Sequence, residues 1–263
     1  METSNRHDNF GLVTVIIPVF NTAKYLVKCL DSVLGQTYRN IEVLAVDDGS
    51  TDGSSVLLSE YARRDSRLTV LTQENQGLSV ARNTGLDAMN PETKYVCFVD
   101  SDDWLPDDSV ASMLDCLEKK AADMVCGLYD IWNDKQRMDW KCPQVHLGDD
   151  DVVSRKEIFY MLTNHLISNY THSWGKLYKV HVVKGCYFPP GKVFEDNICH
   201  RFYGKCNSIA FLNGIVYHYL RREGSITHSG FDERRLDIVE IYVDRIQYFR
   251  EEGFAGYSIQ VLM

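Results

Sequence analysis

The side chains best placed to do chemistry are three acids, Asp100, Asp102 and Asp103, directly after the apolar stretch Tyr95–Val99. The β-branched and aromatic residues of that stretch indicate a buried strand, which would deliver the acids at its end. Carboxylate oxygens suit Mg²⁺ and Mn²⁺, and such ions commonly join protein carboxylates to phosphate groups. The alternative is an acidic turn that only caps the next helix. Because buried strands rarely end in three acids with no basic partner nearby, we favour a metal site.

A second polar group follows another apolar stretch, Ile41–Val46. It starts with Asp47 and Asp48 and continues with Gly49 and Ser50, which suit a turn and a helix N-cap. Taken alone, this segment would be a turn. Beside the first acidic group, we expect one of its carboxylates to hydrogen-bond a ligand.

Two further groups lie in the second half of the chain. Glu195 and Asp196 follow a glycine turn, and a carboxylate here could act as a general base if folding brings it to the metal site. His218 stands shortly before Arg221 and Arg222 and could bind a metal ion or a phosphate. A structural histidine among tyrosines is the commoner alternative.

Apolar stretches of alternating type predict the elements that must position these groups. Strands are expected at Val13–Pro18, Ile41–Val46, Leu68–Leu71 and Tyr95–Val99. The first intervening helix would take Asn21 as its N-cap and end at Gly35. The next two helices are expected at Ser54–Arg64 and Gly77–Met89.

Strands that alternate with helices indicate a parallel sheet with helices on both faces. In such sheets, ligands bind at the carboxyl ends of the strands. The polar segments Pro18–Asn21, Asp47–Asp52 and Asp100–Asp103 all follow predicted strands, so we expect them to form one site.

The second half of the chain is less regular. Helices are expected at Asp107–Lys120, Arg155–Leu162 and Asp232–Arg250, the last of them amphipathic, and an extended segment at Met124–Tyr129. Asp130–Asp151 is polar and rich in turn residues, and Trp174–Tyr219 mixes aromatic residues with Gly and Pro.

Composition excludes several classes of protein. The chain has 263 residues and a net charge of −9, which argues against a nucleic-acid binder. No apolar run approaches the length of a membrane span, and the polar N-terminus does not have the pattern of a signal peptide. The eight cysteines form no Cys-x-x-Cys pair, which argues against a zinc ribbon. We therefore expect reduced thiols and a cytoplasmic location.

The chain resembles the bacterial family-2 glycosyltransferases, which have the GT-A fold. The matching segments follow the family's order between Leu12 and Thr227: Val15–Asn21, Gln36–Tyr38, Val46–Asp52, Gly77–Gly85, Val99–Asp103, Trp174–Tyr178, Glu195–Asp196 and Ser225–Thr227. The resemblance implies an α/β fold with a Rossmann-like, mostly parallel sheet, helices on both faces and a smaller acceptor-side lobe. It also implies a flexible N-terminus (1–11), a nucleotide-sugar-binding half (12–105), an acceptor-binding half of the same domain (106–230) and a C-terminal helical segment (231–263).

The resemblance also assigns residues. The family's Asp-Xaa-Asp motif falls on Asp100–Asp102, so Asp102 would bind Mn²⁺ or Mg²⁺, and Asp100 would contact the ion or the donor ribose. We add His218 as a candidate ligand. Asp48 would meet the nucleobase, and Asp196, paired with Glu195, would be the general base. The expected substrate-binding set is Pro18, Phe20, Asn21, Asp47, Asp48, Arg82, Asp100, Ser101, Arg221 and Arg222.

The implied activity is inverting, metal-dependent transfer of a sugar from a nucleotide donor to a saccharide or lipid-linked acceptor in cell-surface polysaccharide synthesis. A carboxylate such as Asp48 can accept the N3–H of uracil, and we expect a UDP-sugar. The C-terminal helix could pair with a second copy or approach the inner face of the membrane. The alternatives are a haloacid-dehalogenase-like phosphatase, which also carries Asp-Xaa-Asp after a strand, and a catalytically silent GT-A binding module.

Overall fold

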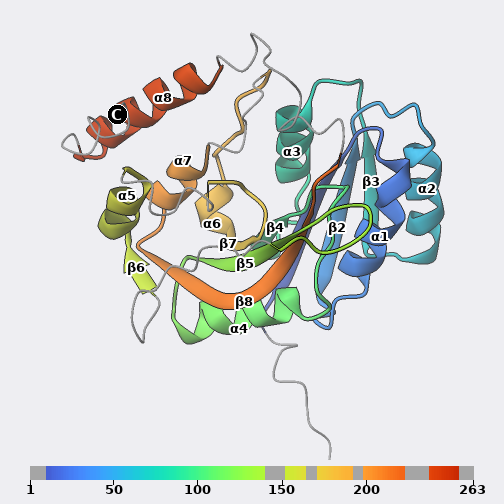
Figure 1. Cartoon of the computed structure of the whole chain (residues 1–263), viewed down its shortest axis with the longest axis horizontal. Coiled ribbons are helices and arrows are strands. Elements are labelled where there is room, and N and C mark those ends of the chain that lie inside the picture. The colour runs from blue at the N-terminus through green and yellow to red at the C-terminus, as the bar shows by residue number, and fades with distance from the viewer. Residues whose placement is uncertain (1–9, 140–151, 164–170, 192–197, 223–236, 255–263) are drawn as a thin grey trace, which may run out of the picture.

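The structure is a computed structural model that describes residues 10–139, 152–163, 171–191, 198–222 and 237–254 (Figure 1). These residues build one eight-stranded sheet with the strand order β3-β2-β1-β4-β7-β5-β8-β6. The strands are β1 (Leu12–Val19), β2 (Ile41–Asp47), β3 (Leu68–Thr72), β4 (Thr93–Phe98), β5 (Met124–Trp132), β6 (Val152–Ser154), β7 (Lys176–Lys179) and β8 (Ser208–Leu220). The predicted α/β fold is confirmed.

Strand direction decides which chain ends share an edge of the sheet. Strands β3, β2, β1 and β4 are parallel, whereas β7 runs antiparallel to both of its neighbours, β4 and β5. Strand β5 therefore has the direction of β4, and β8 is parallel to β5. Consequently the carboxyl ends of β1, β2, β4, β5 and β8 all reach the same edge, while the short β6 is antiparallel to β8.

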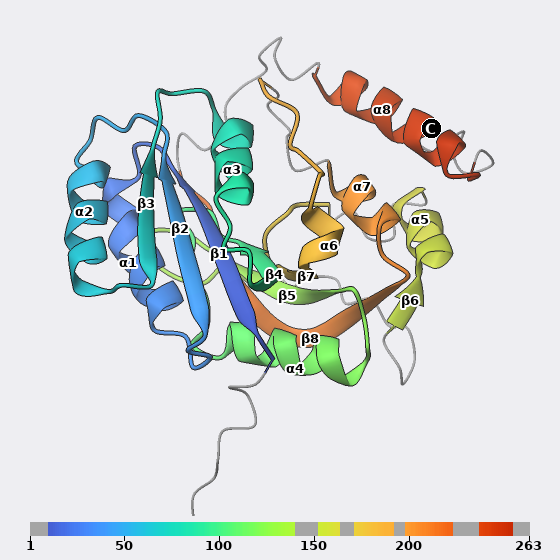
Figure 2. The same ribbon diagram turned by 180° about the vertical axis from the view of Figure 1, so that it is seen from behind.

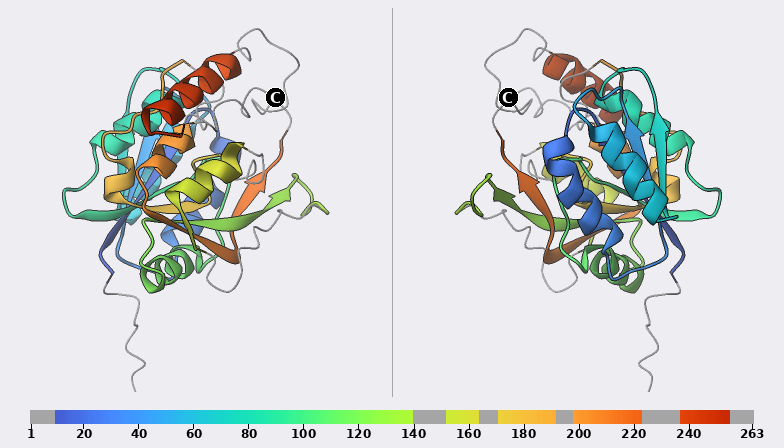
Figure 3. Two further views of the ribbon diagram at one scale, coloured as in Figure 1. Left: turned by 90° about the vertical axis from the view of Figure 1, so that its left-hand side faces the viewer. Right: turned by 90° about the vertical axis from the view of Figure 1, so that its right-hand side faces the viewer.

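Helices cover both faces of the sheet, as the edge-on views show (Figure 3). They are α1 (Ala23–Leu34), α2 (Ser54–Arg64), α3 (Leu78–Asp87), α4 (Ser109–Lys119), α5 (Arg155–Thr163), α6 (Val180–Val183), α7 (Cys199–Gly204) and α8 (Asp237–Glu251). Helix α3 packs on β1 and β2, and α4 packs on β5, β7 and β8. Seen from behind, α2 and α8 lie at opposite ends of the molecule (Figure 2).

Helix α1 shows how local sequence sets the elements that surround the site. Its buried residues recur at helical spacing and form the stripe that faces the core: Leu26, Cys29, Leu30, Val33 and Leu34. The helix ends at Gly35, where a Cβ would lie 2.7 Å from the carbonyl oxygen of Asp31. The predicted end of the helix is confirmed, and the packing of its stripe fixes α1 against the sheet.

The expected N-cap of α1 at Asn21 is wrong, because the helix starts one residue later and Thr22 is its N-cap residue. Asn21 instead has a positive φ of 52°. Its side-chain oxygen accepts the backbone N–H of Thr51 at 2.8 Å, so this residue joins the loop after β1 to the loop after β2.

The second half contains more regular structure than its sequence pattern indicated. The mixed segment Trp174–Tyr219 includes β7, α6, α7 and most of the 13-residue strand β8. The amphipathic helix is confirmed over Asp237–Glu251, and residues 232–236 of the prediction lie outside the described residues. The proposed division near residue 105 stays a prediction.

Two findings bear on the composition arguments. Among the described residues, no helix is both long and apolar enough to span a membrane. None of the seven cysteines in the described ranges forms a disulfide. Most of them are buried in the apolar core beside strands and helices.

Candidate active site

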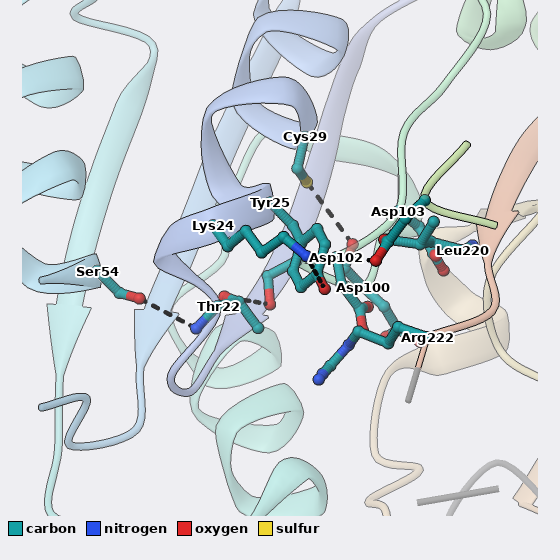
Figure 4. Close-up of polar contacts among 12 residues, drawn as sticks. Thr22, Lys24, Tyr25, Cys29, Ser54, Asp100, Asp102, Asp103, Leu220 and Arg222 are labelled. Atoms are coloured by element: carbon teal, nitrogen blue, oxygen red, sulfur yellow. Dashed lines mark hydrogen bonds and ion pairs between the residues drawn. The ribbon is translucent and has the colours of Figure 1, made fainter. Parts of the chain in front are cut away.

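The loops that follow β1, β2 and β4 meet at the carboxyl edge of the sheet, as predicted (Figure 4). The backbone N–H of Asn21 donates to Ser50 Oγ at 3.1 Å, and that of Thr22 donates to Ser54 Oγ at 3.1 Å. The hydroxyl of Thr22 donates to Ser101 Oγ at 3.0 Å. The first loop therefore bridges the other two loops, although their residues lie far apart in the sequence.

Asp47 holds the turn after β2 in place. Its carboxylate is buried and accepts the backbone N–H of Ser50 at 3.0 Å and the hydroxyl of Ser55. Ser55 lies in the first turn of α2, so this carboxylate ties the end of the strand to the helix that follows. The substrate contact predicted for Asp47 stays a prediction.

Asp48 fixes the segment that leads into α3. Its buried carboxylate accepts three hydrogen bonds: from Gln73 Nε2 at 2.7 Å, from the Gln76 N–H at 2.9 Å and from the Gly77 N–H at 2.8 Å. A carboxylate has about four acceptor positions, so these bonds leave room for about one more donor. The nucleobase role of Asp48 stays a prediction.

Two apolar residues stand at the end of β1, where the nucleoside is predicted to lie. Pro18 is buried within β1, whereas Phe20, just beyond the strand, is 46% exposed. An exposed aromatic ring at a strand end offers a surface on which a planar ring can stack. The contacts predicted for Pro18 and Phe20 stay predictions.

Asp100 forms an ion pair with a buried arginine of α3. Arg82 on α3 is fully buried, and its Nη2 donates to Asp100 Oδ1 at 2.8 Å. The guanidinium also lies 5.2 Å from the centre of the Phe188 ring. The described hydrogen bond of Arg82 is with Asp100. Its predicted contact with a nucleotide stays a prediction.

Asp102 pairs with a second arginine, Arg222, just beyond the end of β8. Arg222 Nε donates to Asp102 Oδ2 at 2.6 Å, and the guanidinium carbon lies 5.4 Å from the centre of the Tyr25 ring (Figure 4). Partial burial lowers the pKa of Arg222, but the hydrogen bond and charge of Asp102 outweigh that effect and raise the pKa overall. The sequence argument that the acids have no basic partner nearby is therefore wrong, since folding supplies one to each of Asp100 and Asp102.

Asp103 turns away from the site and into the core. Its carboxylate is 1% exposed and accepts the hydroxyl of Tyr217 and the N–H of Leu220, both at 2.7 Å. The Tyr217 oxygen in turn accepts the N–H of Asp100 at 3.1 Å. Burial, followed by the charges of Asp102 and Asp100, raises the pKa of Asp103 well above its usual range. Asp103 thus fastens the acidic turn to β8.

Sequence reasoning missed Tyr217 and Tyr25. Tyr217 lies 114 residues from Asp103, and no local pattern connects a tyrosine in a strand to an acidic turn so far away. Tyr25 lies in the first turn of α1, where the sequence pattern gives no sign that it contacts the acidic turn or its partners. Only the packing of α1 and β8 against one turn reveals both contacts.

His218 belongs to an aromatic group beside the site. Its Nδ1 lies 2.6 Å from Asp130 Oδ1 and 3.3 Å from Trp132 Nε1. The ring centre is 5.3 Å from that of Trp104 and 5.8 Å from that of Trp132. These contacts hold the His218 ring within the aromatic group. Its predicted role as a metal ligand stays a prediction.

Glu195 and Asp196 lie outside the described residues, but the segment before them is anchored. Asn83 on α3 brackets the backbone of Phe188, because its side chain accepts the N–H at 2.8 Å and donates to the carbonyl at 2.9 Å. Tyr187 Oη donates to Asp87 Oδ1 at 2.6 Å. The same helix that supports Asp100 therefore holds the chain that leads toward the predicted base.

Arg221 lies between the end of β8 and Arg222. Its backbone N–H donates to the carbonyl of Trp132 at 2.8 Å, and its side chain is exposed. This bond fixes the chain at the edge of the site, and the substrate contact of Arg221 stays a prediction.

The residues present fit a divalent ion. The Asp100 and Asp102 side chains are 22% and 21% exposed, so both carboxylates are reachable at the carboxyl edge. Mg²⁺ is commonly bound through one or two carboxylates, with phosphate oxygens and water completing its shell. Within the described ranges, no group of three or more His, Cys, Asp or Glu side chains is arranged to hold an ion by itself.

Comparison with curated proteins finds glycosyltransferases of similar length and longer. The chain is 36% identical over 250 residues to the glycosyltransferase GlyA of Streptococcus pneumoniae, covering 92% of this chain and 35% of GlyA. It is 34% identical over 260 residues to the glycosyltransferase GlyG of the same organism, covering 95% of this chain and 84% of GlyG. The chain thus spans about a third of one relative and most of the other.

Comparison with solved structures supports the fold. The chain matches S. aureus TarS 1–349 in complex with UDP-GlcNAc with a TM-score of 0.71 and 22% sequence identity, covering 90% of this chain and 66% of that one. A further match is TarS 1–349 in complex with UDP, with a TM-score of 0.64 and 21% identity, covering 92% of this chain and 74% of that one.

The family comparison matches residues 14–186, a segment that includes the loops after β1, β2 and β4 and the acids they carry. Together with the two relatives from S. pneumoniae, this match establishes the family. The chain belongs to glycosyl transferase family 2.

Proposed function

We propose that this protein is an inverting, metal-dependent glycosyltransferase that moves a sugar from a UDP-sugar to a saccharide or lipid-linked acceptor in cell-surface polysaccharide synthesis. The observation that carries the proposal is the pair of reachable carboxylates, Asp100 and Asp102, beside the Arg222 guanidinium in a family-2 chain. In this proposal, the enzyme transfers the sugar in the cytoplasm, at the inner face of the membrane.

The nucleotide part of the proposal rests on the neighbouring structures and on the apolar strand end. TarS, which shares the fold, is seen with UDP and with UDP-GlcNAc. In our proposal the exposed ring of Phe20 stacks on the base, and the remaining acceptor position of Asp48 takes the N3–H of uracil.

The chemistry requires charge neutralisation and a proton acceptor. Asp102, with Asp100, would hold Mn²⁺ or Mg²⁺, which acts as a Lewis acid toward the leaving diphosphate. Arg222 would contribute a positive charge at the same edge. Asp196 would accept the proton of the attacking hydroxyl, and attack on the face opposite the diphosphate would invert the anomeric centre.

The test is a calorimetric titration of UDP and GDP with Mn²⁺, with Mg²⁺ and with a chelator. We expect tighter binding of UDP than of GDP, and a clear loss of UDP affinity in chelator, because the diphosphate would otherwise meet like charges in a partly desolvated cleft. The Asp102→Ala variant should lose the ion-dependent part of the affinity. Asp107→Ala removes an exposed acid nearby and is the matched control.

Four results would count against the proposal. Tight GDP binding without a UDP response would overturn the donor, and equal UDP affinity in chelator would overturn the metal. A donor-hydrolysis assay addresses the alternatives, because a phosphatase would release phosphate from simple esters and a silent GT-A module would turn over nothing. Membership of family 2 already argues against the phosphatase.

A further inference from the structure

The two carboxylates of the acidic turn are neutralised by arginines of different kinds. Arg82 is completely buried and emerges from the middle of α3, so its ion pair with Asp100 is part of the core. The side chain of Arg222 is 26% exposed and lies two residues beyond the end of β8. Burial therefore locks the first pair in place, whereas opening the second pair would affect the contact of Arg222 with the Tyr25 ring and leave the core intact.

The backbone around Arg222 is held while its side chain remains adjustable. The N–H of Leu220 is bonded to Asp103 and that of Arg221 to the carbonyl of Trp132. The guanidinium lies on the face of Tyr25 and reaches Asp102 through Nε. A long side chain on a fixed base can therefore exchange partners by rotation about its own bonds alone.

Arg222 is bound to Asp102, the same carboxylate that the proposed metal ion would need as a ligand. Arg222 Nε lies 2.6 Å from Asp102 Oδ2. A divalent cation at that oxygen would face the guanidinium at short range, where like charges repel strongly in a partly buried site. The ion and Arg222 therefore compete for Asp102. A diphosphate offers Arg222 another partner, because guanidinium pairs well with phosphate oxygens.

We propose that Arg222 is an internal counter-ion that keeps free divalent ions from binding Asp102. When the nucleotide binds, Arg222 moves from Asp102 to the diphosphate, and Asp102 becomes available to the ion. The inference rests on the proposed function, and it adds a selectivity: the site admits the ion together with the nucleotide and discriminates against the ion alone. Ion and nucleotide binding are then positively coupled, by the same factor in either order.

The experiment measures Mn²⁺ binding, by electron paramagnetic resonance of the free ion or by calorimetry, with and without UDP. For Arg222→Ala we expect the affinity for Mn²⁺ alone to rise about tenfold, because a charge-assisted hydrogen bond no longer competes. The UDP affinity in saturating Mn²⁺ should fall in the same variant. Opposite signs in the two measurements are the signature of a residue with two alternative partners.

A matched control separates this competition from a general change in charge. Lys24→Ala removes one positive charge from the same edge, and the described contacts of Lys24 are with Tyr25 and Asp134, not with the acidic turn. We expect less than a twofold change in the affinity for Mn²⁺ alone. Arg222→Gln keeps the stem against Tyr25 and replaces Arg222→Ala if the latter fails to fold.

The outcomes are distinguishable. If the wild-type protein binds Mn²⁺ with UDP, but the arginine variants bind Mn²⁺ alone no better than wild type, the counter-ion role is overturned and the proposed function stands. The same holds if Lys24→Ala raises the affinity as much as the arginine variants do. If the wild-type protein fails to bind Mn²⁺ even with UDP, the metal part of the proposed function falls and the counter-ion role falls with it.

Discussion

Asp102 and Asp103 are chemically identical neighbours in the sequence, yet the turn sends them to opposite environments. The Asp102 side chain is 21% exposed and pairs with Arg222, whereas Asp103 is buried with one hydrogen bond at each carboxylate oxygen. A buried carboxylate is stable only when such partners are present. The first residue is available to a ligand, and the second residue holds the turn that presents it.

Among single side-chain groups near the site, we expect the hydroxyl of Tyr217 to contribute most to the stability of the acidic turn. Tyr217→Phe deletes one atom that donates to Asp103 and accepts from the N–H of Asp100. We expect the free energy of unfolding to fall by about 1–3 kcal/mol, because two buried polar groups lose their partner. The UDP affinity in Mn²⁺ should fall as well, since the acidic turn loses a tether.

Chemical denaturation and calorimetry check this prediction. Tyr187→Phe removes the same atom from an exposed hydrogen bond to Asp87 and should cost about 0.5 kcal/mol or less. Equal effects of the two variants would mean that the Tyr217 contact is not special.

The general base is the second residue-scale prediction, and it comes from the family resemblance. Asp196→Asn keeps the shape of the side chain and removes its basicity, so sugar transfer should fall by about 10²–10⁴-fold with little change in UDP affinity. Transfer rates at saturating donor, together with UDP titration, measure the two effects separately. Glu195→Gln is the matched variant, and an inactive Glu195→Gln beside an active Asp196→Asn would make Glu195 the base.

At the scale of elements, α8 is attached to the rest of the molecule through α7 and α5. A Cβ on Gly204 would lie 1.9 Å from Tyr248 Oη, so the glycine permits the close approach of the two helices. Asp244 on α8 lies 3.0 Å from His200 Nε2 and also pairs with Arg201. Val239 and Val243 remain 57% exposed on the same helix. The docking of α8 therefore combines close packing with one ion-pair group.

The Asp244 group should make the attachment of α8 dependent on pH. The hydrogen bond from His200, and then the bond from Arg201, lower the pKa of Asp244 below its usual value against the opposing effect of burial. A carboxyl with a lowered folded-state pKa contributes its stability fully above the unfolded value of about 3.9, and loses it as the pH falls through the folded value. Asp244→Asn should therefore be less stable than wild type at pH 7, and the difference should begin to narrow once the pH falls below about 3.9, so that it is smaller at pH 3.

Urea unfolding at both pH values measures that difference. The side chain of Asp244 is 45% exposed, so we expect about 1 kcal/mol or less at pH 7. Glu251→Gln makes the same charge change on the same helix, at a residue whose described contact is an exposed bond from Gln247, and should show a smaller effect. A gap that stays constant with pH would argue against the His200–Asp244 interaction.

At the scale of the whole molecule, one apolar core joins the two halves of the chain. The sheet runs from β3 to β6 through the pairing of β4 with β7, and the core cluster includes residues from both halves, such as Val15 and Leu177. Phe98 packs against Tyr178 and Phe188, which come from beyond the predicted boundary. The two halves of the chain thus share one interior.

We therefore expect the two halves to unfold together in a single cooperative transition. Three of the four tryptophans, Trp132, Trp140 and Trp174, lie in the second half, so fluorescence reports mainly on that half, whereas far-ultraviolet circular dichroism reports on the whole chain. The two probes should give the same urea midpoint. Separate midpoints would mean that the halves are independent domains and would contradict the division into two halves of one domain.

Local sequence patterns were sufficient to predict the strands and helices of the first hundred residues and the edge of the sheet where the site lies. Apolar runs mark β1, β2 and β4 because a strand buried on both faces needs them, and the alternation with helices forces a parallel sheet. Parallel strands bring their carboxyl ends to one edge, so local patterns were enough to bring Asn21, Asp48 and Asp100 to the same site.

The contacts of individual polar side chains, in contrast, follow from the packed fold and from no local pattern. Arg222 meets Asp102 across 120 residues, and Tyr217 meets Asp103 across 114. These pairings depend on the register of β8 against β5, which shifts near Leu128, and no local pattern specifies such a shift. The direction of a side chain from a turn and the register of distant strands are properties of the packed chain, and they separate the partly exposed carboxylate of Asp102 from the buried carboxylate of Asp103.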